Sequence, residues 1–271
     1  MPKTAIWIVL ATFVALPRAA SSAEQRPEIR ETARAALAEH GAAIITVELL
    51  LTQRYIAEGR ERNSSESTLE IAGTVLNAAG LTVVSDAASN PGAMSGSPPG
   101  ASTRLESETG AVRLVLADGR EVPAHFVLRD SDLDLAFLMP DEPLEEQPHV
   151  GFQTTPLAQP LDDLILLFPM AKSLNRQIGL AVAPIRAVLR KPRDFLVMDT
   201  FVGLQGLGCP AFDSEGRAIG LIVMRRSPIQ PRSSGGFRDM FEFLTPVVLT
   251  SADVLEVAEQ AISHANEGEQ E

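Results

Sequence analysis

Cysteine and histidine are scarce in this sequence of 271 residues. The single cysteine, Cys209, excludes an intramolecular disulfide. The four histidines are His40, His125, His149 and His264. They are too scattered along the chain to suggest a metal cluster. The composition therefore implies no metal and no cofactor.

Positive charge is scarce as well, with 23 lysines and arginines against 35 aspartates and glutamates and a formal net charge of −12. This charge disfavours a polyanion such as nucleic acid, or an anionic membrane face, as a partner. Basic or neutral peptide surfaces remain open. We therefore expect a protein or peptide partner, while the sequence specifies no oligomeric state.

The N-terminal segment has the three parts of a secretory signal peptide. Lys3 supplies a positive charge, residues 5–16 are apolar, and residues 21–23 (S-S-A) supply a small-residue cleavage site. An uncleaved anchor helix is the weaker alternative, because a span needs about 20 apolar residues and Pro17 ends this run early. We expect cleavage after Ala23, no membrane insertion of the mature protein, and a secreted or periplasmic location. An exported protein without disulfides fits a bacterial periplasm or cell surface.

The rest of the chain alternates between apolar, β-branched runs and turn residues, which is typical of antiparallel sheets. The hydrophobic content of 45% is enough for one large all-β domain or two small ones. Residues 69–85 predict a hairpin joined at residues 77–80, and residues 111–129 predict another with Asp118-Gly119 at its turn. Further strands are expected at residues 42–51, 164–169, 177–190, 195–201 and 241–249.

Helices and loops are predicted around these strands. Residues 27–41 predict a helix with proline in its first turn and glycine at its end. Ser251 is an N-cap for a closing amphipathic helix. Its apolar stripe would consist of Val254, Leu255, Ala258 and Ile262. We expect a polar loop over residues 59–68, a mobile Gly-, Pro- and Ser-rich surface loop over residues 88–107, and a proline-containing linker over residues 140–160.

Residues 201–224 read F-V-G-L-Q-G-L-G-C-P-A-F-D-S-E-G-R-A-I-G-L-I-V-M. A glycine-rich turn, a proline that starts a strand, a D-S-E-G turn and a buried apolar strand follow one another. The stretch resembles the nucleophile loop of trypsin-like serine proteases of the high-temperature-requirement (Deg) type, where G-N-S-G-G-P-L precedes N-x-x-G-x-V-I-G-I. With Pro210 as the anchor, Leu207 takes the position of the serine. No serine occurs between Ser173 and Ser214, so the absence of the serine does not depend on this register.

Other segments resemble the same family. The hairpin at residues 69–85 is similar to the family's G-x-V-I-x-x-x-G-x-V-x-T-N-x-H-V. The matching positions are Gly73, Val75, Gly80 and Val83. This match places Ala87 at the histidine position, and no histidine occurs between His40 and His125. Residues 129–138 (R-D-S-D-L-D-L-A-F-L) are similar to R-D-x-x-x-D-L-A-x-L around the triad aspartate, which places Asp134 there.

The resemblance implies an all-β fold of two packed antiparallel six-stranded β-barrels, as in trypsin. The first barrel would span about residues 42–140 and the second about residues 160–249. An N-terminal helical segment, residues 24–41, and a C-terminal helix, residues 251–265, would flank them. No segment is left for a PDZ domain of the kind that many Deg-type proteins append.

Of the triad that the resemblance implies, only Asp134 survives. Triad chemistry needs a hydroxyl or thiol nucleophile, an imidazole within ~3 Å and a carboxylate that orients the imidazole. Leu207 cannot attack a carbonyl, and Ala87 cannot accept a proton. Gln205 stands at the position of the glycine two before the serine, where a side chain disfavours the turn that forms the oxyanion hole.

The sequence contains two other candidate nucleophiles, Cys209 and Ser234. Cys209 lies two residues past the nucleophile position with no histidine near it in sequence, and we interpret it as a small buried residue. The S-G-G triplet at Ser234 lies downstream of the G-x-x-I-G-L strand, which is the wrong place for a nucleophile. Residues 232–237 are expected to form a surface loop.

Two functions are compatible with these residues. The first is a non-catalytic peptide- or protein-binding module or scaffold that uses the cleft between the barrels or a sheet edge. There Leu221 and Ile222 would pair with an extended peptide. The second is an endopeptidase with an unorthodox nucleophile, supported by the glycine-rich loop and by Asp134. We expect backbone N–H groups around Ala87 and Ala88 to hold the Asp134 carboxylate.

Overall fold

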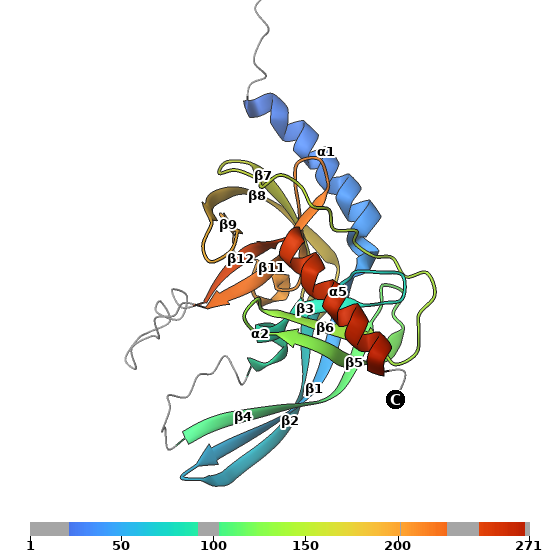
Figure 1. Ribbon diagram of the computed structural model, residues 1–271, viewed down its shortest axis with the longest axis vertical. Helices are drawn as coiled ribbons and strands as arrows, with labels where there is room; N and C mark the ends of the chain where they lie inside the picture. The colour runs from blue at the N-terminus through green and yellow to red at the C-terminus, as the bar shows by residue number, and fades with distance from the viewer. Residues whose placement is uncertain (1–21, 92–102, 201, 227–243, 269–271) are drawn as a thin grey trace, which may run out of the picture.

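The computed structural model describes residues 22–91, 103–200, 202–226 and 244–268. These residues form two closed antiparallel barrels with a helix at each end of the chain (Figure 1). The first barrel has the strands β1 (Ile44–Ala57), β2 (Arg60–Val75), β3 (Thr82–Ser85), β4 (Thr103–Val115), β5 (Glu121–Asp130) and β6 (Leu135–Pro140). The second has β7 (Asp163–Pro169), β8 (Ile178–Leu189), β9 (Phe195–Met198), β10 (Pro210–Phe212), β11 (Ala218–Arg226) and β12 (Leu244–Thr250).

Neighbouring strands follow the order β1-β2-β3-β6-β5-β4 in the first barrel and β10-β11-β12-β9-β8-β7 in the second. The predicted fold class of two packed six-stranded antiparallel barrels is therefore confirmed. The two predicted hairpins are present as β2–β3 and β4–β5, and Gly119 has the positive φ of 86° that its tight turn requires.

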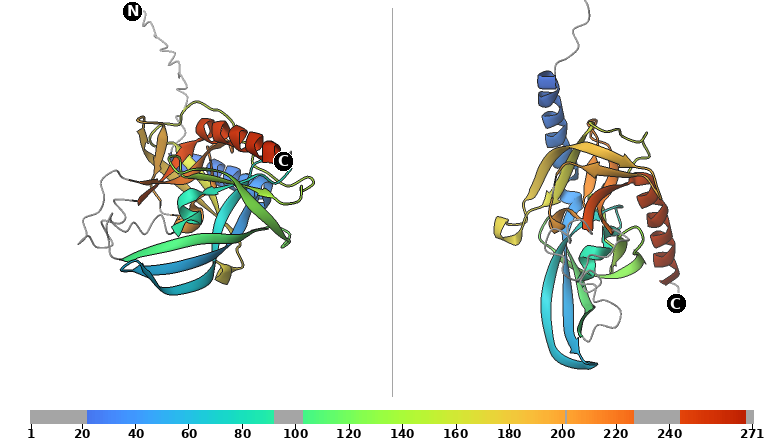
Figure 2. Two further views of the ribbon diagram at one scale, coloured as in Figure 1. Left: turned by 60° about the horizontal axis from the view of Figure 1, so that its bottom comes forward. Right: turned by 90° about the vertical axis from the view of Figure 1, so that its left-hand side faces the viewer.

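The predicted polar loop at residues 59–68 is wrong, because β2 pairs with β1 without a break from Arg60 to Thr74, apart from a bulge near the tip. Together with the first half of β4, these strands form a long twisted ribbon that projects from the first barrel (Figures 1 and 2). Most of β2 in this ribbon is exposed, so it lacks the apolar alternation by which strands are found in a sequence.

The predicted loop at residues 88–107 is also corrected at both ends. A short helix, α2 (Asp86–Ser89), contains its first two residues, and β4 already begins at Thr103. Ser85 caps α2, because its side-chain oxygen accepts the Ala88 N–H. Residues 92–102 lie outside the described residues.

Helix α1 (Ser22–His40) starts five residues before the predicted Pro27 and packs on the second barrel through Ala33 and Ala36. Helix α5 (Ser251–Gly268) crosses both barrels, as Figure 1 shows, with Val254 and Ala258 in its buried stripe. Ile262 was predicted in that stripe but is 39% exposed, and Ala261 is buried instead.

The linker between the barrels has no strand, as predicted, and is tied to both of them. The Val150 N–H donates to Val75 O in β2, and the Gln153 N–H donates to Ala218 O in β11. Among the described residues no helix is long and apolar enough to cross a membrane. The predicted signal peptide, apart from its last two residues, and Ser234 lie outside the described residues.

Candidate functional site

Asp134 lies at the junction of the two barrels, in the turn before β6, and is only 5% exposed. Its Oδ1 accepts the Ala87 N–H at 2.6 Å. Its Oδ2 accepts the Met224 N–H at 2.6 Å and the Ser85 hydroxyl at 2.7 Å. One carboxylate therefore binds donors from β3, α2 and β11, so it joins both barrels.

This arrangement confirms one part of the prediction for Asp134 and corrects another. The Ala87 N–H donates as expected, but the Ala88 N–H donates to Ser85 Oγ at 3.1 Å instead. Burial raises the pKa of Asp134 to about 6, although the N–H groups of Met224 and Ala87 and the Ser85 hydroxyl oppose this rise. The carboxylate therefore has three donors and a protonation equilibrium close to neutral pH.

Ala87 is fully buried, and its methyl group belongs to the same apolar cluster as Leu207. Two of the described histidines have hydrogen-bond partners elsewhere: His125 Nδ1 lies 2.7 Å from Asp141 Oδ1, and His149 Nδ1 lies 3.0 Å from Gln147 O. His40 stacks on Phe212 with ring centroids 5.1 Å apart, and His264 is exposed on α5. Within the described residues no hydrogen bond or ion pair joins a histidine to Asp134.

Leu207 is fully buried at the end of a 3-10 turn, Leu204–Gly206. Its backbone N–H donates to Leu204 O at 3.2 Å. The N–H that the motif register would assign to an oxyanion hole therefore already has an acceptor within its own turn. Gln205, at the other oxyanion-hole position, is exposed at the rim of a cavity of about 90 Å³.

Gly208 brings this loop against the first barrel by direct backbone contact. Its φ is 81°, and a Cβ atom here would lie 2.9 Å from Ala72 O and 3.1 Å from the Ser85 nitrogen. The Thr74 hydroxyl donates to Gly208 O at 2.7 Å. Only glycine fits both the left-handed backbone and the close approach.

Cys209 is fully buried, and its Sγ lies 3.7 Å from Gln205 O. Burial raises the pKa of the thiol well above its usual range. A raised thiol pKa disfavours the thiolate, which is the nucleophilic form of cysteine. These features are those of a buried structural cysteine.

Leu221 and Ile222 do not form an open sheet edge, which corrects that prediction. Leu221 pairs with Pro210 on one side and with Leu249 on the other. The Ile222 N–H donates to Cys209 O at 2.8 Å, and Ile222 O accepts the Gly208 N–H at 2.8 Å. An added strand would have to displace existing bonds at both residues.

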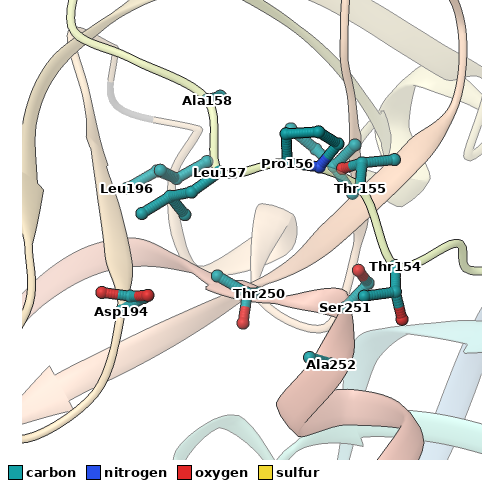
Figure 3. Close-up of a pocket in the computed structure, with 11 residues that line it drawn as sticks. Thr154, Thr155, Pro156, Leu157, Ala158, Asp194, Leu196, Thr250, Ser251 and Ala252 are labelled. Atoms are coloured by element: carbon teal, nitrogen blue, oxygen red, sulfur yellow. The ribbon is translucent and has the colours of Figure 1, made fainter.

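A separate cavity of about 130 Å³ lies where the linker passes the start of α5 (Figure 3). Threonine side chains, Ser251 and Asp194 surround it, and the Ser251 hydroxyl already donates to Gln153 O at 2.7 Å. None of Ala87, Asp134 and Leu207 lines this cavity. Within the described residues, no three His, Cys, Asp or Glu side chains are grouped to hold a metal ion.

Sequence reasoning missed Met224 and Ser85 as donors to Asp134. The role of Ser85 could have been predicted, because a serine before Asp86 is a typical helix N-cap and lies in the segment that carries the motif. The Met224 N–H is a backbone donor from the other barrel, and no sequence pattern marks such a group.

Comparison with known proteins supports the fold. Solved structures with the same architecture include two of the HtrA-type protease AlgW, one with a decapeptide and one with a tripeptide. Their TM-scores are 0.56 and 0.57, both at 17% identity. The serine endoprotease from Yersinia pestis matches with a TM-score of 0.56 at 14% identity. These matches cover 85 to 86% of this chain and 64 to 68% of those chains.

The chain thus has the trypsin-like double-barrel fold of HtrA-type serine proteases, which agrees with the resemblance in its motifs. No protein-family model matches the chain. No curated protein matches its sequence.

Proposed function

We propose that this protein is an exported trypsin-like domain that has lost its catalytic serine and histidine and acts as a non-catalytic peptide- or protein-binding module. The observation that carries the proposal is the state of Leu207. Its side chain is fully buried and its N–H is bonded within its own turn. Leu207 can neither attack a carbonyl nor donate its N–H to an oxyanion, so the serine position has no catalytic group.

The state of the two other triad positions supports the same proposal. Ala87 offers no proton acceptor, and the Asp134 carboxylate is occupied by three donors that belong to the fold. In an active protease such a carboxylate orients an imidazole. Here it instead accepts hydrogen bonds from both barrels, which is a structural role.

The alternative is an endopeptidase with an unorthodox nucleophile. Cys209 is the single cysteine of the chain, but its full burial and the raised pKa of its thiol both oppose its reaction with a substrate. The non-catalytic function is therefore favoured over this alternative.

Binding fits the cleft between the barrels, where residues of both barrels line the cavity of about 90 Å³. The solved AlgW structures hold short peptides, which favours a peptide as the class of partner. β12 pairs with one edge of β11, and β10 pairs with the other edge only as far as Leu221. A peptide strand would therefore have to pair with this second edge beyond Ile222, where no described strand occupies it. Even there the Met224 N–H already donates to Asp134, so side-chain recognition in the cleft must supply much of the affinity.

Location in the periplasm or outside the cell is part of the proposal, and it depends on the signal-peptide pattern before Ala23. N-terminal sequencing of the protein purified from its native envelope tests it. A mature chain that begins at Glu24 supports export, and an intact Met1 contradicts it.

The test of inactivity uses a fluorophosphonate probe and unfolded casein with the mature protein. We expect no labelling and no hydrolysis, and Cys209→Ser should leave any background rate unchanged. A variant with Ala87→His and Leu207→Ser shows whether restored side chains alone recover labelling. Labelling of the wild type that disappears in Ser234→Ala, or a ~100-fold rate drop in Cys209→Ser, would establish an enzyme and overturn the proposal.

A further inference from the structure

Strands β1 and β2 place two carboxylates next to each other. Glu48 stands directly opposite Glu70 in the register of the two strands. Their side chains are only 14% and 25% exposed. Like charges directly opposite one another destabilise a sheet, so this pair requires a cationic partner.

Arg176 supplies that cation from the second barrel. It lies in the loop between β7 and β8, residues 170–177, which we call the strap. Arg176 Nη2 donates to Glu70 Oε1 at 2.7 Å and to Glu48 Oε1 at 3.1 Å, and Nε donates to Glu70 Oε2 at 3.1 Å. Lys172 Nζ lies 3.2 Å from Glu70 Oε1. The hydrogen bonds with Arg176 lower the pKa of Glu70 and raise the pKa of Arg176.

The backbone of the strap is held in an unfavourable conformation. Asn175 and Arg176 have φ values of 55° and 52°, so two consecutive residues other than glycine lie in the left-handed region. Such residues persist where surrounding contacts hold them in place. Backbone hydrogen bonds from Asn175 to Lys172 O and from Arg176 to Ala171 O hold the turn, and the ion pairs of Arg176 add contacts with the first barrel.

The strap also forms a wall of two cavities along the barrel junction. The cavity of about 90 Å³ reaches Gln205 and contains Glu70 in its lining. The other, of about 330 Å³, extends from the strap to the β4–β5 turn at Gly119. Arg176 lines both cavities, so its side chain stands at the boundary between them.

We propose that the strap is a self-bound ligand, and that an arginine side chain of the partner replaces Arg176 between Glu48 and Glu70. The inference rests on the proposed function and deepens it by naming the partner's chemistry, an extended segment that carries arginine. Displacement would release the two left-handed residues and join the two cavities into one groove. The net charge of −12 attracts such a segment.

The experiment measures fluorescence anisotropy with a labelled nine-residue peptide that has one arginine at the centre of a glycine–serine sequence. The control peptide carries citrulline, which has the shape of arginine without its charge. Arg176→Ala removes the internal competitor and should tighten arginine-peptide binding ~10-fold. In that background, Glu48→Gln with Glu70→Gln should weaken binding at least ~10-fold.

Matched variants control for charge alone. Arg54→Ala breaks the exposed ion pair of Arg54 with Glu108, which has a donor–acceptor distance of 3.0 Å, and should leave affinity unchanged. Glu108→Gln with Glu58→Gln removes two exposed carboxylates and should also have little effect. Equal binding of the arginine and citrulline peptides, or equal effects of Arg176→Ala and Arg54→Ala, would overturn the proposal.

Hydrogen exchange on the unmodified protein covers the case in which Arg176→Ala fails to fold. Saturating arginine peptide should speed amide exchange in residues 170–177, because the strap is released. Unchanged or slower exchange there would show that the strap is not displaced. Hydrolysis of casein by the same preparation would instead contradict the proposed function, so the two failures are distinguishable.

Discussion

Replacing Asp134 separates the cost of its buried charge from the benefit of its hydrogen bonds. The folded-state pKa is raised from 3.8 to about 6. Because it lies above the unfolded-state value, the contribution of this group to stability is fully present below pH 3.8 and is lost as the pH rises through about 6. At ~1.4 kcal/mol per pKa unit, the ionised carboxylate costs the folded state ~3 kcal/mol at pH 7.

Asp134→Asn removes this charge but keeps one acceptor oxygen. That oxygen can accept from Met224 and Ser85, which leaves the Ala87 N–H facing an amide NH₂ group. One unpaired buried donor costs ~1–3 kcal/mol, which nearly cancels the relief of charge burial at pH 7. We therefore expect a change below ~1 kcal/mol at pH 7 and a loss of ~1–3 kcal/mol at pH 4.5, where the wild-type carboxyl is protonated.

Asp134→Leu orphans both backbone donors, Met224 N–H and Ala87 N–H, while the Ser85 hydroxyl can rotate to another acceptor. Two unpaired buried donors cost ~2–6 kcal/mol, so after subtraction of the ~3 kcal/mol of relieved charge the expected loss at pH 7 is ~0–3 kcal/mol. Urea unfolding of the wild type and the two variants at several pH values from 4.5 to 7.5 measures these differences. Groups common to all three proteins cancel in the comparison.

A difference between wild type and Asp134→Asn that stays constant from pH 4.5 to 7.5 would mean that the carboxyl does not titrate in this window. Negligible losses in both variants at every pH from 4.5 to 7.5 would mean that Asp134 is solvated and structurally idle. A large loss of partner binding at unchanged stability would place Asp134 in the recognition surface.

Gly208→Ala should lower the free energy of unfolding in urea by more than ~2 kcal/mol, because it adds a clash with Ala72 O to a left-handed backbone. The control Gly59→Ala, at φ 72° with open space around it, should lower it by only ~1–2 kcal/mol. Equal losses in the two variants would show that the clash contributes nothing. His40→Phe keeps the stacking on Phe212 and should reduce the loss of stability in acid. Burial lowers the pKa of His40 below 6.5, so its contribution is present above pH 6.5 and is lost as the pH falls. Melting temperatures at pH 7.5 and 5 test this, and an equal decrease in both proteins would contradict it.

The strands of the two barrels were largely predictable because runs of apolar and β-branched residues mark their buried segments. In β7, for example, an unbroken apolar run from Leu164 to Leu167 is fully buried. The motif around Asp134 also placed it correctly at a buried position with the Ala87 N–H as a donor. Local patterns of this kind depend only on residues that are close in the sequence, so a single sequence is enough to predict them.

Features that depend on distant backbone atoms could not be predicted. The Met224 N–H reaches Asp134 across 90 positions of the chain, and any residue other than proline would supply the same donor. Predicting that Glu48 lies opposite Glu70 requires the register of β1 and β2. The apolar pattern of the two strands specifies this register only inside the barrel. The ribbon beyond the barrel was missed for a related reason, because its faces are both polar over much of its length.

The contact of Gly208 with the first barrel limits how the molecule can move. Backbone atoms of one barrel touch backbone atoms of the other at this glycine, and the Thr74 hydroxyl fixes the same point. Sliding of packed elements occurs where adaptable side chains separate them, and hinge rotation requires a few residues free to change their φ and ψ values. Neither condition holds at this contact. The two barrels should therefore turn as one rigid body, and any conformational response to a ligand has to arise in the loops.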